Sequence, residues 1–154
     1  MDNGGRVVVD ASLALKWVLD EPHSGEAQQL LDLWVRRRVI VMAPTLLAFE
    51  AANILYQRAR RGQLTVEAAG EALAALMGTH LTLMGGDEPD LADQALKLAE
   101  AYRLPATYDA AYMGLALRWD CPLWTADERL WNQVHPRAPW VRRVGEVEQG
   151  PPTC

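Results

Sequence analysis

Four acidic residues are spaced along this sequence in a pattern that could bring them to a single site. They are Asp10, Glu50, Asp109 and Asp127. Asp10 directly follows the β-branched run RVVV, and Asp127 comes three residues after the apolar run PLW. Short apolar runs of this kind are typical of buried strands. Since ligands of open α/β sheets bind outside the C-terminal ends of the strands, we expect these carboxylates to lie at one edge of a sheet.

The motif T-x-D occurs twice, and each time it opens a segment of helical character. Thr107 precedes Asp109 in TYDAAYMGLAL, and Thr125 precedes Asp127 in LWTADERL. A Thr before a helix favours N-capping, and an acid in the first turn is stabilised by the helix dipole. Taken alone, each motif is better explained by helix structure. The presence of the other acids favours a second role, as part of a site.

Glu50 lies in the segment LLAFEAANILY, which has few other polar residues. On a helix, Glu50, Asn53, Gln57 and Arg60 fall on one stripe, and the remaining surface is apolar. This pattern predicts a helix that is buried on more than one side. An enclosed carboxylate is costly unless it has a cation or a hydrogen-bond donor. Contact with Arg58 or Arg60, or exposure to solvent, would explain Glu50 without a site.

Carboxylates gathered at one edge would repel one another. They could coexist only with protons held at raised pKa values or with a bound divalent cation. The set offers only oxygen ligands, which suits Mg²⁺ or Mn²⁺. Such an ion can orient a water molecule, lower its pKa and offset charge on a phosphate, which is the chemistry of phosphodiester hydrolysis. The chain has no P-loop, no G-x-G-x-x-G after its first strand and no G-x-S-x-G motif.

The elements that would position these acids alternate between strands and helices. Strands are predicted at residues 6–9, 39–43, 80–84, 122–124 and, at an edge, 140–144. Helices are predicted at residues 12–19, 26–37, 45–61, 65–77, 89–103, 107–119 and from 126 onward. This alternation indicates an α/β sandwich, three-layer α/β/α, around a central and mainly parallel sheet. We expect one domain over residues 1–147 and a flexible C-terminal tail at 148–154.

Composition narrows the class of protein further. The net charge of −5 argues against a protein that coats nucleic acid non-specifically. Thirteen of the 15 basic residues are Arg, clustered at 36–38, 58–61 and 142–143, where they are either solvated or contact phosphate. No apolar run approaches the roughly 20 residues that span a bilayer, and the N-terminal apolar stretch is too short for a signal peptide. We therefore expect a cytoplasmic protein with no membrane partner. The two cysteines suggest neither a disulfide framework nor a zinc site.

Together, the motifs resemble those of PIN-domain ribonucleases, and more closely the VapC toxins of bacterial and archaeal toxin–antitoxin pairs. The matching segments are VVVDAS (7–12), LLAFEAANIL (46–55), TYDAAYMGLAL (107–117) and LWTADERL (123–130). Each motif is short, but their order and spacing agree over nearly the whole chain and give the family's succession of Asp, Glu, Asp and Asp. The resemblance implies a PIN-like domain with metal-dependent endoribonuclease activity, a hydrolase acting on RNA phosphodiester bonds.

The resemblance also implies a role for each matching residue. Asp10 and Asp109 match the family's direct ligands of Mg²⁺ or Mn²⁺. Glu50 and Asp127 match the acids that complete the site, directly or through water. The supporting polar positions are matched by Ser12, Asn53 and Thr125. As partners, the family implies an RNA substrate, a second copy in a homodimer and a cognate VapB-like antitoxin that inhibits the enzyme.

Three other functions remain open from the sequence. A PIN nuclease could act in RNA maturation, or on structured DNA, outside any toxin–antitoxin pair. A metal-binding scaffold could keep the acids and bind partners without catalysis. A phosphoacceptor receiver domain also clusters acids around Mg²⁺, but it needs paired acids after its first strand and a late Lys. This chain has the single Asp10 there, and its two lysines are Lys16 and Lys97.

Overall fold

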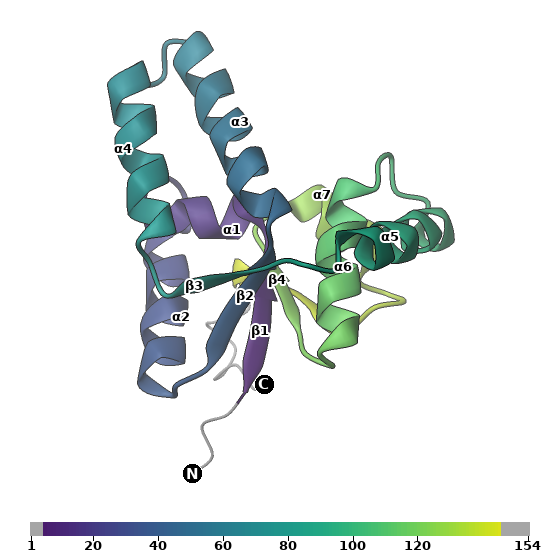
Figure 1. The fold of residues 1–154 in the computed structure, drawn as a ribbon. Coiled ribbons are helices and arrows are strands. Elements are labelled where there is room, and N and C mark those ends of the chain that lie inside the picture. Colours follow the sequence, from purple (N-terminus) through teal and green to yellow (C-terminus); the bar gives the residue numbers. More distant parts are fainter. Residues whose placement is uncertain (1–4, 146–154) are drawn as a thin grey trace.

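The computed structural model describes residues 5–145, which form a five-stranded sheet flanked by helices (Figure 1). The strands are β1 (Arg6–Val9), β2 (Ile40–Pro44), β3 (Leu81–Met84), β4 (Leu123–Thr125) and β5 (Val141–Arg143). Their order across the sheet is β3-β2-β1-β4-β5, and every pairing is parallel. The predicted α/β/α fold with a mainly parallel sheet is confirmed, and the predicted last strand lies at an edge.

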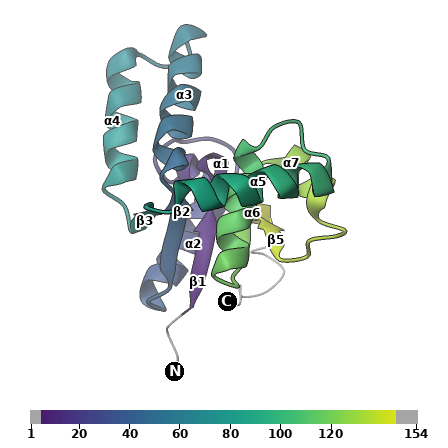
Figure 2. The same ribbon diagram turned by 45° about the vertical axis from the view of Figure 1, so that its right-hand side comes forward.

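Helices cover both faces of the sheet, and two of them extend beyond the C-terminal ends of the strands. They are α1 (Ala11–Ala14), the 3₁₀ helix η1 (Leu15–Trp17), α2 (Ser24–Arg36), α3 (Leu46–Arg60), α4 (Val66–Met77), α5 (Glu88–Tyr102), α6 (Tyr108–Arg118) and α7 (Glu128–Val134). In Figure 1, α2 lies on one side of the strands, and α5 and α6 lie on the other. Helices α3 and α4 form a hairpin that projects past the C-terminal ends of the strands in both views (Figures 1 and 2).

The core is built around β1, the central strand. Val7, Val8 and Val9 are completely buried, as expected for a parallel strand covered on both faces. Trp34 on α2 meets Trp124 on β4 edge-to-face, with ring centroids 6.0 Å apart and an angle of 67° between the rings. This contact packs α2 against the sheet. The central strand, held on both faces, provides a fixed base for the residue that follows it, Asp10.

The burial of α3 differs from the prediction. Its buried residues are Leu47, Ala51 and Leu55, which form a single stripe at i, i+4 and i+8. Phe49 and Tyr56 are 76% and 57% exposed. The prediction of burial on more than one side is therefore wrong. The hairpin projects past the sheet, so α3 packs mainly against α4 and α1 and much of its circumference stays exposed (Figures 1 and 2).

The observed boundaries of several helices differ from the predicted ones. The predicted helix at 12–19 is split into α1 and η1, and α7 begins at Glu128 rather than at residue 126. The predicted flexible tail at 148–154, and the last residues of the predicted domain, lie outside the described residues. Within residues 5–145, none of the helices has the length and apolar character needed to cross a bilayer.

Candidate active site

Asp10 is held at the C-terminal end of β1 by three hydrogen bonds. It is the N-cap of α1, and its Oδ1 accepts from the backbone N–H of Leu13 at 3.0 Å and from Ser12 Oγ at 2.7 Å. Its Oδ2 accepts from Thr125 Oγ1 at 2.5 Å. A carboxylate offers about four acceptor positions, so about one remains on Oδ2. The side chain is thus fixed in orientation and still able to bind one further group.

Burial makes the ionised form of Asp10 unfavourable. The residue is 4% exposed, and with Thr125 it is one of two polar residues buried in the described core. Desolvation raises the pKa of Asp10 to about 7, although the hydrogen bonds from Thr125, Ser12 and Leu13 oppose the shift. The charge of Asp109 raises it further. A buried carboxylate in this state binds either a proton or a cation.

Asp127 has the structural role that the sequence assigned to Thr125. The N-cap of α7 is Asp127, whose Oδ1 accepts from the backbone N–H groups of Arg129 at 2.9 Å and Leu130 at 3.3 Å. Thr125 is the last residue of β4, so the expectation that it caps the helix is wrong. Its hydroxyl instead accepts from Asp127 N at 2.9 Å and donates to Asp10. Thr125 therefore links two of the acids.

Asp109 lies in the first turn of α6, at the centre of the acidic set. Its carboxylate is half-buried and makes no hydrogen bond among the described residues. Burial is the largest cause of its raised pKa, followed by the charge of Asp127, while the charge of Arg129 acts in the opposite direction. The charge of Asp109 also raises the pKa values of Asp10 and Glu50. Asp109 thus interacts with all three other acids.

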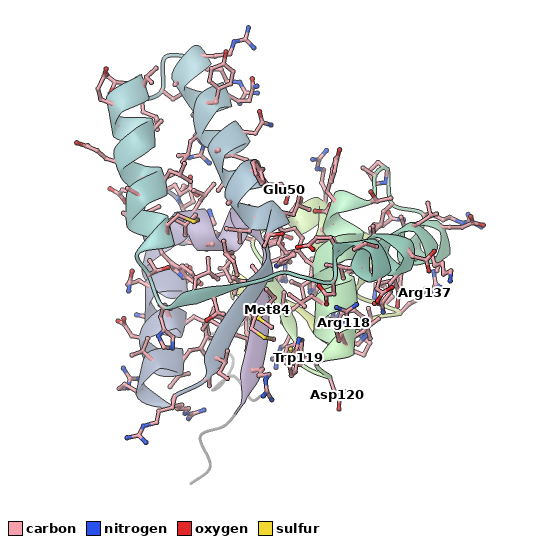
Figure 3. The ribbon with its side chains drawn as sticks, in the orientation of Figure 1. Glu50, Met84, Arg118, Trp119, Asp120 and Arg137 are labelled. Carbon is pink, nitrogen blue, oxygen red and sulfur yellow. The ribbon has the colours of Figure 1, made fainter. Side chains whose placement is uncertain are left out.

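Glu50 points to a partner that the sequence did not suggest. Its Oε1 accepts a hydrogen bond from Tyr112 Oη at 2.5 Å, across α3 and α6. Arg58 pairs with Glu21 instead, at 2.5 Å. Burial raises the pKa of Glu50, the Tyr112 hydrogen bond lowers it, and Asp109 raises it. Figure 3 shows Glu50 on the part of α3 nearest the sheet, where the strands end.

Tyr112 itself is fully buried, and its hydroxyl lies among the acids. The pKa of Tyr112 is raised by burial and by the charges of Glu50, Asp10 and Asp109. It therefore stays protonated and donates to Glu50. Tyr112 follows Asp109 by one helical turn, so both face the same side of α6.

Replacing Tyr112 with Phe should remove this donor without leaving a cavity. At pH 8 we expect a loss of about 1 kcal/mol in the free energy of unfolding, since a half-buried carboxylate loses its donor. The measurement is thermal unfolding of the metal-free protein. Tyr108→Phe is the control, because Tyr108 lies on the same helix and is 57% exposed. Equal effects of the two changes would contradict the assigned role of the Tyr112 hydroxyl.

Of the three supporting residues, two contact an acid. Ser12 Oγ donates to Asp10, lies 3.4 Å from Thr125 Oγ1 and accepts from the backbone N–H of Ala126 at 3.1 Å. Thr125 contacts Asp10 and Asp127. Asn53 is exposed on α3, and its Oδ1 lies 3.5 Å from Gln57 Nε2. The structure thus gives Asn53 a contact along its own helix rather than with an acid.

The donor chemistry of the site fits a hydrated hard cation. The four acids supply only oxygen, one acceptor position remains on Asp10, and Asp109 has no hydrogen-bond partner among residues 5–145. Within the described part of the chain, no three acidic, histidine or cysteine side chains form a ready-made metal cage. Mg²⁺ does not need one, because it keeps several waters and binds through one or two carboxylates.

A pocket of about 200 Å³ opens beside these acids. Its lining includes the charged residues Asp109, Asp127 and Arg129 and the apolar residues Leu104 and Leu130. Arg129 was not among the predicted site residues, although it lies in the LWTADERL motif two residues after Asp127. Its position in the first turn of a helix, two residues after a predicted site acid, could have indicated that Arg129 is part of the site. Arg129 places a positive charge beside the carboxylates, and this charge opposes the rise in the pKa of Asp109.

The fold matches that of a solved structure. The crystal structure of PAE2754 from Pyrobaculum aerophilum superimposes with a TM-score of 0.68, covering 94% of each chain at 22% sequence identity. At this level of identity the similarity defines the architecture alone, a parallel sheet flanked by helices.

The sequence comparisons define the family. The PIN domain family model matches residues 7–134, a range that contains all four acids. Ribonuclease VapC3 from Pyrobaculum aerophilum is 30% identical over 125 residues, which cover 81% of this chain and 92% of that protein. The chain therefore belongs to the PIN-domain family, and its similarity to a VapC ribonuclease supports the VapC type within it.

Proposed function

We propose that this protein is a metal-dependent endoribonuclease, the toxin of a toxin–antitoxin pair. The observation that carries the proposal is the half-buried carboxylate of Asp109, which interacts with three other acids and has no hydrogen-bond partner within the described residues. A group of carboxylates arranged in this way is stabilised by bound protons or by a cation, and a divalent cation is the option that also supports hydrolysis. The similarity to Ribonuclease VapC3 supports RNA as the substrate.

Each residue has a distinct part in this proposal. Asp10 and Asp109 would bind Mg²⁺ or Mn²⁺ directly, and Glu50 and Asp127 would bind it directly or through its waters. When bound, the ion supplies a water of lowered pKa and offsets charge on the scissile phosphate. Ser12 and Thr125 keep the Asp10 carboxylate in one orientation through their hydrogen bonds.

The direct test is cleavage of a labelled single-stranded RNA by the purified protein. We expect cleavage with Mn²⁺ or Mg²⁺, complete loss of cleavage in EDTA, and recovery when the metal is restored in excess. Asp10→Asn, purified in parallel, controls for contaminating nucleases and should be at least about a hundred times slower. Cleavage by Asp10→Asn at the wild-type rate would exclude the proposed site. Metal binding without cleavage would instead support a non-catalytic scaffold.

The proposed partners are an RNA, a second copy of the chain and a VapB-like antitoxin, and the proposed place of action is the cytoplasm. Exposed apolar side chains such as Phe49, Leu96 and Tyr108 offer surface for protein contacts. If the protein is a toxin, its expression should arrest growth, and co-expression of a small DNA-binding protein encoded beside it should relieve the arrest. A PIN nuclease of RNA maturation would cleave RNA without such an inhibitor.

A further inference from the structure

A second pocket, of about 230 Å³, adjoins the acidic site and carries basic side chains. Its lining includes Ser12, Lys16, Glu21, Ile54, Arg58 and Ala126. None of the proposed metal ligands lines it, and the proposed reaction leaves Lys16 and Arg58 without a role. A basic pocket beside a group of carboxylates is unusual enough to require an explanation.

Two hydrogen bonds and one helical spacing place this pocket next to the acids. Ser12 donates to Asp10 at 2.7 Å, so one wall of the pocket also supports the proposed metal ligand. Ala126 donates its N–H to Ser12 Oγ at 3.1 Å and directly precedes Asp127, which lines the other pocket. Ile54 lies one helical turn beyond Glu50 on α3. Both pockets therefore adjoin the acidic site, one through Asp109 and Asp127 and the other through Ser12 and Ala126.

The charges in this pocket do not cancel. Glu21 accepts from both Lys16 Nζ, at 3.2 Å, and Arg58, at 2.5 Å. Lys16 Nζ also donates to the carbonyl of Pro22 at 2.8 Å. Two cations thus share one carboxylate, and a formal charge of +1 remains. Arg58 has five N–H donors, so several are available to a further ligand.

The two basic side chains are held in place before any ligand arrives. The Lys16, Glu21 and Arg58 side chains are 13%, 14% and 30% exposed. Glu21 fixes both cations from the loop before α2, and little side-chain freedom is left to lose on binding. A preorganised, partly buried guanidinium with free donors is suited to phosphate.

We propose that this pocket binds a phosphate of the RNA backbone next to the one that is cleaved, with Arg58 and Lys16 as its ligands. The inference rests on the proposed ribonuclease function. It explains how a chain of net charge −5 could hold RNA against a set of carboxylates. The metal ligands act on one phosphate, and the pocket fixes its neighbour.

The test measures binding of a labelled single-stranded RNA at several salt concentrations. Asp109→Asn serves as the background, so that the RNA is not cut. Arg58→Gln should weaken binding roughly tenfold, as loss of a charge-assisted contact. It should also reduce the slope of log affinity against log salt by about 0.7, the value for one phosphate on a single strand. Lys97→Gln is the matched control, because Lys97 is 76% exposed on α5, and it should leave the slope unchanged.

Two further variants separate binding from a structural role. Arg58→Lys keeps the charge and should keep the slope. Glu21→Gln raises the formal charge of the pocket from +1 to +2, and its amide oxygen can still accept a hydrogen bond from Arg58 or Lys16, so it should strengthen RNA binding. If the cluster only anchored α3 to the loop before α2, Glu21→Gln would lower thermal stability without any gain in RNA affinity. Arg58→Gln with the wild-type slope in a folded protein would overturn the proposal.

Failure of the phosphate-pocket proposal can be distinguished from failure of the proposed ribonuclease function. If the wild type cuts RNA with Mn²⁺ and Arg58→Gln keeps the wild-type slope, the pocket assignment is wrong and the nuclease stands. If the wild type fails to cut RNA but Arg58→Gln lowers the slope, the pocket binds RNA phosphate and the proposed catalytic function is wrong.

Discussion

Asp109→Asn is expected to slow RNA cleavage at least about a hundredfold and to leave the protein folded. The carboxylate makes no hydrogen bond within residues 5–145, so an amide of the same shape breaks no internal contact. The lost charge is the one that interacts with Asp10, Glu50 and Asp127. Because the variant removes a proposed metal ligand, its affinity for Mn²⁺ should fall as well.

The readouts for this variant are single-turnover cleavage, Mn²⁺ binding by calorimetry and thermal unfolding. Asp93→Asn is the control, since Asp93 is an exposed acid on α5 that pairs with Lys97. It should cut RNA at the wild-type rate. Wild-type cleavage by Asp109→Asn would exclude its place as a metal ligand. Loss of cleavage with unchanged Mn²⁺ affinity would move its role from metal binding to contact with the RNA.

The parallel sheet could be predicted because strands and helices alternate along the chain. RVVV is apolar enough to predict a buried strand, and each predicted strand except the last is followed by a helical segment. The helix boundaries were harder to predict, because they depend on which side chain caps each helix. In LWTADERL both Thr125 and Asp127 are good caps. Only the structure shows that Thr125 Oγ1 is already engaged by Asp10, which leaves the cap to Asp127.

The positions of Asp10 and Asp127 were also predictable, since each follows a parallel strand and the C-terminal ends of parallel strands meet at one edge of the sheet. The contacts that surround the acidic site could not be predicted. The hydrogen bond from Tyr112 to Glu50 joins residues 62 positions apart, on two helices whose packing no local pattern encodes. The burial of α3 could not be predicted either. Its apolar circumference predicted burial, but its single buried stripe depends on how far the α3–α4 hairpin projects from the sheet.

The pairing of Arg58 shows how local charge patterns can mislead. Arg58 and Arg60 follow Glu50 on one helix, which makes them natural candidates to neutralise it. In the structure Arg58 turns to Glu21, and Arg60 lies 3.5 Å from Gln57. Glu50 is left with the neutral Tyr112 and with like charges around it. Among residues 5–145, no basic side chain pairs with Glu50, so this part of the site stays open to a metal ion.

Asp10→Asn is expected to stabilise the metal-free protein at pH 8 while it abolishes cleavage. Burial raises the pKa of Asp10 from its usual 3.8 to about 7. In the unfolded chain the group ionises near pH 4, so between pH 4 and 7 the folded state holds more protons than the unfolded one. Stability therefore falls as the pH rises through this range, and the full penalty remains above it. A shift of this size corresponds to roughly 4 kcal/mol, as an upper estimate.

An amide removes that penalty and keeps most of the contacts of Asp10. Asn Oδ1 can still accept from Leu13 N–H and Ser12 Oγ, and its amide can donate to Thr125 Oγ1 once that hydroxyl rotates. We expect a gain of about 2 to 4 kcal/mol at pH 8 and almost none at pH 4, measured by urea unfolding. Asp93→Asn should show neither change. Saturating Mn²⁺ should stabilise the wild type at pH 8 and leave Asp10→Asn nearly unaffected, because a cation replaces the missing proton only where the carboxylate is present. If Asp10→Asn instead lowers stability at pH 8, the carboxylate is held by its hydrogen bonds without strain, and the need for a cation at this position disappears.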